Sequence, residues 1–416
     1  MNFRDWQQLN PEQAARELLH RIATRLAPGQ QRAAIAHLPS EVELLAEFSR
    51  APRSAPLAGV PYFLKDLFPV AGQPIFAGST FLPEVLPSGT QDSAVVRSLR
   101  AAGAVPAGRA QMHEFAYGIT GENPHYGDCA HPAFPDRTSG GSSSGSAALV
   151  AAGVVPLAIG TDTGGSVRLP AAFCGLFGFR LQPRNKLIAD AFPLAPSYDT
   201  AGWFTANAGD MRTAIDALVG LQSEMRTPKG CYVELPGLDA DVAHACFAAA
   251  GRLAAPADSA TRGALLAAFS PALETYSTVV AAEAWAVHRG WAERFQPRYD
   301  PAVWQRLIRG RSLTTAQRDA ARQATTTIKA EWSRYFQTYD FLLLPASPCA
   351  ALTKAECTAA NRSRMLALTS PASIGGLPVL TLPVPLPSGL TTGLQVVVSE
   401  PRSPVVPWVL DQIRRE

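Results

Sequence analysis

The sequence predicts an α/β protein built as one large domain. Helix-like and strand-like segments alternate between about residues 57 and 160, which is typical of an α/β layout. Strand patterns also occur on both sides of a long helical tract, and no linker rich in glycine and serine divides the chain. Of the 416 residues, 47% are hydrophobic and 17% are charged, which provides apolar material for a large core. We therefore expect residues 1–416 to form a single domain, with residues 1–50 as a helical segment packed on it.

The first predicted element is a helix that begins after Asn10. Asn10 can cap this helix, Pro11 occupies its first turn, and Gln13 can reach back to the cap, as in a capping box. Apolar residues then recur at helical spacing as far as Leu26. The later expected elements, in chain order, are a strand at 57–64, a helix at 93–102, strands and helices at 104–107, 144–152 and 154–159, a helical tract at 241–332, strands at 339–345, 379–383 and 394–398, and a last helix at 409–415.

Charge and composition argue against several classes of partner. The 37 basic and 34 acidic residues leave a net charge of +3, and no run of five basic residues occurs, so neither nucleic acid nor a membrane surface is an expected partner. The apolar stretch at 146–160 contains Gly153 and Pro156 and is shorter than the roughly 20 residues of a membrane span. The N-terminus lacks the build of a signal peptide, and the six cysteines form no C-x-x-C pair. We expect a cytoplasmic protein without a metal or cofactor.

Two loops rich in serine and glycine, at residues 140–146 and 160–166, are the most informative part of the chain. A helix-like run and a strand-like run separate them. About ten helical residues advance roughly 15 Å, and six strand residues return roughly 20 Å, so the two loops should meet at one edge of the sheet. Consecutive glycines let backbone N–H groups converge on an anionic oxygen. A helix starting at Pro170 would aim further N–H groups the same way.

A serine nucleophile in these loops requires a base. His113, His125 and His131 precede the loops in polar, turn-rich surroundings, which makes them poor candidates. Lys65 directly follows the apolar run at residues 60–64, and burial there would lower its pKa toward the neutral form that a base needs. The residues alone therefore favour Lys65 as the base.

Each of these features also has a simpler interpretation. A serine-glycine cluster is often a flexible turn, and a lysine at a strand end is often exposed to solvent. Residues 141–145 also match G-x-S-x-G, the nucleophile elbow of an α/β-hydrolase-type serine esterase, which would make Ser143 the nucleophile. That motif needs a preceding strand, and residues 131–136 (HPAFPD) form a poor one.

The same residues resemble the amidase signature family. Residues 140–148, followed by GTDTGGSVRLPAAFCG at 160–175, resemble the defining segment of that family. The resemblance covers roughly residues 57–410, and it implies a central mixed β-sheet flanked by helices. The supporting matches, in chain order, lie at residues 59–66, 122–127, 344–348, 376–378 and 393–395.

The resemblance implies a catalytic triad of two serines and a lysine. Carried over by position, Ser166 is the nucleophile, Ser142 is the bridging serine and Lys65 accepts the proton. The family places a cis peptide bond before the bridging serine, here between Gly141 and Ser142. The activity implied is hydrolysis of a carboxylic or urea-type amide through an acyl-enzyme on Ser166, with release of ammonia or an amine and without a cofactor.

The resemblance also assigns residues around the triad. Asp162 and Arg168 are expected to form a structural salt bridge, and Cys174 is expected to be a buried packing residue. The backbone N–H groups expected to form the oxyanion hole belong to Thr163, Gly164, Gly165 and Ser166. The residues expected to line the acyl side of the site are Phe115, Ala116 and Tyr117.

Two alternatives to a free-standing hydrolase stay open from the sequence. One is an amidase-like subunit of an amidotransferase that delivers ammonia to a partner, and the other is a catalytically silent binding protein. The sequence departs from the family at residues 178–183 and in a shortened region at 221–269, both of which bear on the rim of the pocket. The expected partner is a small-molecule amide of unspecified identity, and a homodimer is the candidate assembly.

Overall fold

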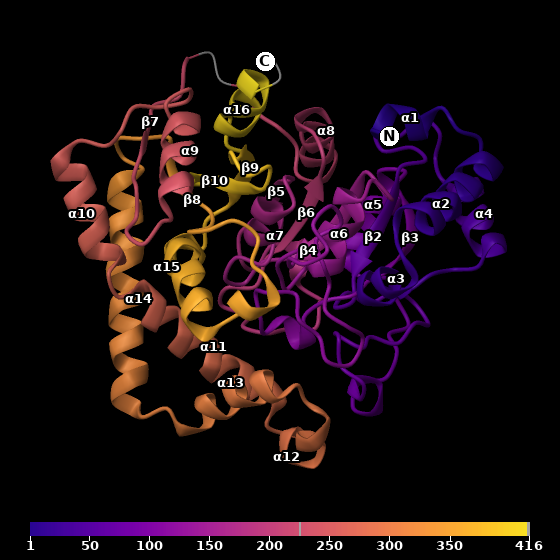
Figure 1. Cartoon of the computed structure of the whole chain (residues 1–416), viewed down its shortest axis with the longest axis horizontal. Coiled ribbons are helices and arrows are strands. Elements are labelled where there is room, and N and C mark those ends of the chain that lie inside the picture. The colour runs from indigo at the N-terminus through magenta and orange to yellow at the C-terminus, as the bar shows by residue number, and fades with distance from the viewer. Residues whose placement is uncertain (224–225, 414–416) are drawn as a thin grey trace.

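The chain folds around one ten-stranded sheet in this computed structural model, which describes residues 1–223 and 226–413 (Figure 1). The strand order is β1-β3-β2-β4-β6-β5-β9-β10-β8-β7. Strand β2 pairs in parallel with β3 and β4, and β7 with β8, whereas the other pairings are antiparallel. The predicted α/β class with a mixed sheet is thereby confirmed. The strands are β1 (Ile35–His37), β2 (Pro61–Lys65), β3 (Val105–Ala110), β4 (Leu157–Thr161), β5 (Phe177–Arg180), β6 (Ala201–Thr205), β7 (Gly230–Tyr232), β8 (Phe341–Pro345), β9 (Val379–Pro385) and β10 (Thr391–Val398).

Helices cover the sheet, and two groups of helices lie at opposite ends of the molecule (Figure 1). The N-terminal helices α1 to α4 gather at one end of the molecule, while α10, α11, α13 and α14 gather at the other (Figure 1). The helices are α1 (Phe3–Gln7), α2 (Pro11–Arg25), α3 (Pro28–Ala34), α4 (Glu41–Arg50), α5 (Ala94–Ala101), α6 (Ser144–Ala151), α7 (Arg168–Phe173), α8 (Ala208–Leu218), α9 (Ala240–Ala250), α10 (Ser259–Phe269), α11 (Ala272–His288), α12 (Ala292–Phe295), α13 (Pro301–Ser312), α14 (Thr315–Tyr335), α15 (Ala359–Gly375) and α16 (Val405–Ile413).

Alternating residues of the central strands face two separate parts of the core. In β8, Leu342 and Leu344 pack with the helical tract, whereas Phe341 and Leu343 pack with the helices on the opposite face. This alternation is the period of two that a strand imposes on its side chains. A third cluster joins the N-terminal helices to the sheet, with Leu18 and Phe63 among its buried members. Helices therefore bury both faces of the sheet.

The first predicted helix is confirmed with its cap. The Asn10 side chain accepts a hydrogen bond from the Gln13 backbone N–H at 2.9 Å, and the Gln13 side chain accepts one from the Asn10 N–H at 3.1 Å. The strand expected at 57–64 begins only at Pro61, because Gly59 has a positive φ of 70° and residues 57–60 form a turn. The strand expected at 154–159 is displaced to β4, since Gly153 has a φ of 67° and ends α6 with a turn. The last helix, α16, begins at Val405 rather than at 409, and its expected end at 415 lies outside the described residues.

The segment Ser259–His288 has the length and the apolar composition of a membrane span, a property that the sequence analysis did not single out. In the structure this segment is two helices, because α10 ends at Phe269 and α11 begins at Ala272. Leu265 and Val280, one from each helix, are buried in the core with the strands of the sheet. Its apolar side chains thus supply part of the hydrophobic core.

Candidate active site

Lys65 lies at the carboxyl end of β2, between β3 and β4 in the sheet, and its side chain is fully buried. Its Nζ lies 2.7 Å from Ser142 Oγ, 3.0 Å from Ser143 Oγ and 2.8 Å from Thr161 Oγ1. Ser142 and Ser143 belong to the first serine-glycine loop, and Thr161 belongs to the second. The prediction that the two loops meet at one edge of the sheet, beside Lys65, is therefore confirmed.

The surroundings of Lys65 favour its neutral form. Burial lowers the pKa of Lys65 to about 7, although the negative charges of Asp162 and Asp199 oppose this shift. The Ser143 hydroxyl donates to the Thr161 carbonyl at 3.1 Å, so its oxygen is available to accept from Lys65. A neutral amine has two N–H donors, which Ser143 and Thr161 can accept, and one lone pair. When Ser143 and Thr161 accept these two N–H groups, the lone pair is directed at Ser142, 2.7 Å away, which is the geometry needed to take the Ser142 proton.

Ser142 is held by its backbone. The peptide bond between Gly141 and Ser142 is cis, as the family resemblance implied. The Ser142 carbonyl accepts a hydrogen bond from the His113 N–H at 3.1 Å, and the Gly141 N–H donates to the Ile119 carbonyl at 2.9 Å. A Cβ on Gly141 would lie 2.6 Å from the Gly121 nitrogen, so the close approach of these two backbones requires glycine.

Asp162 organises the second loop by accepting its backbone N–H groups. Its Oδ1 accepts from the Gly165 N–H at 2.8 Å, and its Oδ2 accepts from the Val167 N–H at 3.1 Å. The Gly165 N–H is therefore engaged, which corrects the prediction that it faces the oxyanion hole. Among the described residues, the N–H groups of Thr163, Gly164 and Ser166 donate to no protein atom.

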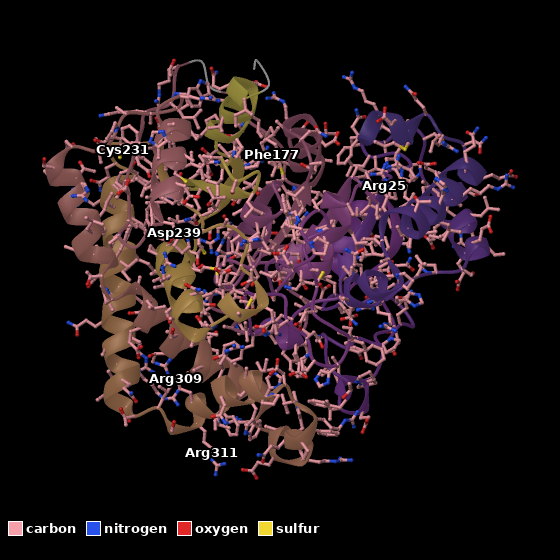
Figure 2. The ribbon with its side chains drawn as sticks, in the orientation of Figure 1. Arg25, Phe177, Cys231, Asp239, Arg309 and Arg311 are labelled. Carbon is pink, nitrogen blue, oxygen red and sulfur yellow. The ribbon has the colours of Figure 1, made fainter. Side chains whose placement is uncertain are left out.

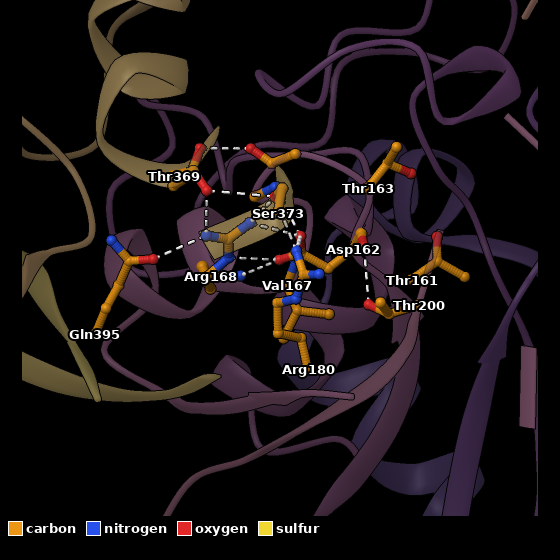
Figure 3. Close-up of polar contacts among 12 residues, drawn as sticks. Thr161, Asp162, Thr163, Val167, Arg168, Arg180, Thr200, Thr369, Ser373 and Gln395 are labelled. Atoms are coloured by element: carbon orange, nitrogen blue, oxygen red, sulfur yellow. Dashed lines mark hydrogen bonds and ion pairs between the residues drawn. The ribbon is translucent and has the colours of Figure 1, made fainter. Parts of the chain in front are cut away.

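The Asp162 carboxylate sits in a buried network of charges, drawn in Figure 3. Its Oδ1 lies 2.9 Å from an Nη atom of both Arg168 and Arg180, which confirms the expected Asp162–Arg168 salt bridge. Burial would raise the pKa of Asp162, but the two guanidiniums hold it well below its usual range. Arg168 also donates to the Thr369 carbonyl and to Gln395, from α15 and β10.

Arg180 was not among the predicted site residues. It ends the apolar strand Phe177–Arg180, and Lys65 ends its own apolar strand in the same way. A charged residue closing a buried strand was thus a sequence signal for both side chains. Nothing local in the sequence indicates that Thr369 and Ser373 join this network, because they approach it only through the packing of α15.

Ser166 is the last residue of the second loop, two residues before α7. The residue is 3% exposed, and its hydroxyl makes no hydrogen bond with any described residue. The structure thus brings Lys65 and Ser142 into contact but does not join Ser166 to Ser142 by a hydrogen bond. Helix α7 begins at Arg168, so Pro170 is its third residue rather than its start, contrary to the prediction.

Of the three residues expected to line the acyl side, the structure places one at a cavity. Ala116 lines a cavity of about 600 Å³ together with Thr161 and Thr163, so this space borders the Lys65 cluster. Phe115 does not line that cavity, and its ring packs on Phe81, His288, Tyr299 and Phe192, the last of which does line it. Tyr117 also lies outside its lining. A larger hollow of about 790 Å³, between α11 and α14, is lined by Gln182 and Pro183 of the divergent segment 178–183 but by none of the predicted catalytic, oxyanion or substrate-binding residues.

Ser143 does not have the environment of a nucleophile elbow. It is fully buried, and its hydroxyl is held by Lys65, by the Thr161 carbonyl and by the Thr161 N–H. No strand precedes it at residues 131–136. Cys174 is buried as expected, and its thiol donates to the Ser139 carbonyl at 3.4 Å.

The three histidines make no contact with a loop hydroxyl. His125 pairs with Glu114 at 3.0 Å, and His131 contacts the Phe173 carbonyl at 3.1 Å. His113 is 1% exposed, and neither of its ring nitrogens has a hydrogen-bond partner among the described residues. Burial holds the pKa of His113 well below its usual value.

A mixed sheet whose edge joins two serine-glycine loops to a buried lysine is the arrangement expected of an α/β hydrolytic enzyme. A family model for amidases matches residues 15–246 and 252–401. The chain belongs to the amidase family, which confirms the resemblance read from its motifs.

Individual relatives agree with this assignment. An indoleacetamide hydrolase from Pseudomonas savastanoi is 41% identical over 212 residues, which are 49% of this chain and 46% of that protein, so the alignment spans about half of each. One component of the glutamyl-tRNA(Gln) amidotransferase from Anaeromyxobacter sp. (strain K) is 33% identical over 401 residues, which are 85% of this chain and 81% of that one. A crystal structure of an amidase superposes with a TM-score of 0.86 at 31% identity and covers 100% of this chain and 99% of the other.

Proposed function

We propose that this chain hydrolyses a small carboxylic amide with Ser166 as nucleophile, Ser142 as proton bridge and Lys65 as base. The observation that carries the proposal is the buried Lys65 amine, 2.7 Å from Ser142 and with a pKa of about 7. A buried neutral lysine beside a serine in a glycine-rich loop is suited to activating a hydroxyl nucleophile. Membership in the amidase family supports the same reaction.

The reaction proceeds in two halves. Ser166 Oγ forms a bond to the amide carbonyl carbon, while its proton passes to Ser142 and the Ser142 proton passes to Lys65. The N–H groups of Thr163, Gly164 and Ser166 stabilise the negative oxygen. The C–N bond then breaks, and the departing nitrogen takes the proton from Lys65 through Ser142. Water attacks the resulting ester, the carboxylic acid leaves, and Ser166 regains its proton.

A fluorophosphonate probe tests the nucleophile directly. We expect stoichiometric labelling, with the adduct located on Ser166 by tandem mass spectrometry, and protection by a hydrolysed amide from a panel of aliphatic, aryl and urea-type amides. An adduct on Ser143 would instead support the esterase alternative. Absence of both labelling and hydrolysis would support the silent binding protein.

The pKa of Lys65 predicts the pH dependence of the reaction. Because the base acts in its neutral form, kcat/KM is expected to rise about tenfold per pH unit below pH 7 and to level off above it. A pH series from 5.5 to 9 on one neutral amide measures this limb. The Lys65→Arg variant keeps a positive charge that cannot be lost, so it should be inactive across the series. A rate independent of pH below 7 would contradict Lys65 as the base.

In this scheme Ser143 supports Lys65 and is not the nucleophile. Removing its hydroxyl distinguishes these two roles. The Ser143→Ala variant loses one acceptor for Lys65 and is expected to retain activity within about tenfold of wild type, the effect of a single hydrogen bond. Steady-state rates on the same amide measure this. A loss of 10⁴-fold or more would restore Ser143 as the nucleophile.

Ammonia delivery to a partner is the second candidate function, since the amidotransferase component from Anaeromyxobacter matches most of this chain. Purification of the tagged chain from its host distinguishes the two. Hydrolysis by the isolated chain supports the first function, and a stable heteromeric complex needed for turnover supports the second. The single-domain organisation, the cytoplasmic location and the homodimer remain predictions.

A further inference from the structure

Two arginines near the proposed site have no carboxylate partner among the described residues. Arg306 on α13 and Arg362 on α15 are both partly buried, and burial lowers the pKa of Arg306 to about 10 and also lowers that of Arg362. Neither makes an ion pair with any residue that the structure describes. Arg306 Nη1 donates only to the Tyr117 carbonyl, whereas the Arg362 side chain makes no hydrogen bond with a described residue and its Nε is enclosed.

Neighbouring arginines on the same helices are paired. Arg309 on α13 contacts Glu274 at 2.7 Å, and Arg364 on α15 contacts Asp239 at 2.6 Å. Figure 2 labels Arg309 on the helical side of the molecule and Asp239 close to α15. The absence of a partner is therefore a property of Arg306 and Arg362, not of arginines on α13 and α15 in general.

The unpaired arginines border the second serine-glycine loop, residues 160–166, through two tyrosines; because it carries the proposed oxyanion donors, we call it the oxyanion loop. The Tyr276 hydroxyl packs on Gly164 so closely that a Cβ there would lie 2.1 Å from it. Tyr276 and Tyr117 are both buried, and both are electrostatic neighbours of Arg362. The backbone carbonyl that holds Arg306 belongs to Tyr117, one residue after Ala116 at the cavity.

Helix α15 provides a direct link between Arg362 and the same loop. Thr369 Oγ1 donates to the Gly164 carbonyl, and Arg362 precedes Thr369 by two helical turns on one face. Side chains of a helix lean toward its N-terminus, so the Arg362 side chain extends away from Thr369 along α15. Its electrostatic neighbour Tyr276, which packs on Gly164, places the guanidinium near this loop.

The local charges leave these guanidiniums uncompensated. A guanidinium stays protonated in proteins, and burying it without a counter-ion is unfavourable. Arg306 and Arg362 also repel each other. Asp300 and Glu122 are the carboxylates whose charges act on Arg306. Both are engaged elsewhere, because Asp300 caps α13 through the Ala302 N–H and Glu122 pairs with Lys354.

We propose that Arg306 and Arg362 bind a carboxylate carried by the substrate, so that the amide hydrolysed bears an anionic group a few bonds from the scissile carbonyl. This inference rests on the proposed amide hydrolysis. Arginine binds carboxylates with two parallel N–H donors. The substrate carboxylate would supply the missing counter-ion and would hold the amide at the oxyanion loop.

Matched substrates that differ only in the carboxylate test this specificity. Succinamic and glutaramic acids are compared with butyramide and valeramide, which have the same numbers of carbons but no charge. We expect kcat/KM of the wild type to be at least tenfold higher for the acids. Arg362→Gln and Arg306→Gln should each lower kcat/KM for the acids by about 10- to 100-fold, mainly through KM, and change it for the neutral amides by less than threefold. Arg362→Lys should recover part of the preference.

The control is Arg364→Gln, which removes a paired arginine from the same helix and should leave the preference for acids intact. Binding is also measured without turnover, by calorimetric titration of glutaramic acid and of valeramide into the Ser166→Ala variant. Equal binding and equal kcat/KM for acid and neutral amide would overturn the proposal, as would an equal loss for both in Arg362→Gln. Tighter binding of the acid without any hydrolysis by wild type would instead contradict the proposed reaction and retain the carboxylate site.

Discussion

The Ser166→Ala variant is expected to lose amide hydrolysis by a factor of about 10⁴ to 10⁶ in kcat while its free energy of unfolding stays nearly unchanged. Removal of the nucleophile has an effect of this size in serine hydrolases, because the remaining groups stabilise the oxyanion without forming the acyl-enzyme. The stability is expected to hold because the Ser166 hydroxyl makes no hydrogen bond with a described residue. Ammonia release from a small primary amide measures kcat, and urea denaturation measures stability.

Ser146→Ala is the matched control for this variant. Ser146 is as buried as Ser166 and lies in the first serine-glycine loop, but its hydroxyl donates to the Ile159 carbonyl at 2.9 Å and makes no contact with Lys65. Its removal should lower stability by about 1 kcal/mol and leave kcat within severalfold of wild type. Wild-type turnover by Ser166→Ala would contradict the assignment of the nucleophile, whatever the control does.

Local signals in the sequence predicted which helices and strands are present better than they predicted the residues at which these elements begin and end. The helix after Asn10 was correct at its start because the capping box lies entirely within four neighbouring residues. The β2 and β4 boundaries were wrong by several residues because apolar character continues into the turns before them, at residues 57–60 and 154–156. Tertiary packing buries those turns, and a buried turn and a buried strand have the same hydrophobicity in the sequence.

In the candidate active site, too, local features were predictable and features that depend on tertiary packing were not. Lys65 and Ser142 were predictable because each lies in a short motif, and the helix and strand between the two loops fix their meeting. The hydrogen bond from the Gly165 N–H to Asp162 could not be predicted, since it depends on the orientation of one Asp162 oxygen. Nor were Arg306 and Arg362 predictable, because α14 and β8 separate their helices in the chain and α15 reaches the loop only in the folded molecule.

Asp162→Asn is expected to lower the free energy of unfolding by about 3–5 kcal/mol, the effect of removing one partner from a buried ion pair. The substitution keeps the shape of the side chain but leaves Arg168 and Arg180 buried without a counter-charge. It also replaces one acceptor oxygen by an amide nitrogen, which then faces either the Gly165 N–H or the Val167 N–H. Since this loop carries the proposed oxyanion donors, kcat should fall together with stability. Urea denaturation at pH 7 measures the first effect, and steady-state hydrolysis measures the second.

The pH dependence of the wild type provides a second measure of the same group. The folded-state pKa of Asp162 is lowered, so its stabilising effect is fully present above the unfolded value of about 3.8 and is lost as the pH falls toward the folded value. Asp319→Asn is the control, because Asp319 pairs with Arg322 at 2.8 Å on the exposed face of α14 and should contribute less than about 1 kcal/mol. If Asp162→Asn were no more destabilising than Asp319→Asn, the buried network would not hold the oxyanion loop. A loss confined to Asp162→Asn would mean that this loop depends on the buried charge of its own Asp162, paired with Arg168 and Arg180.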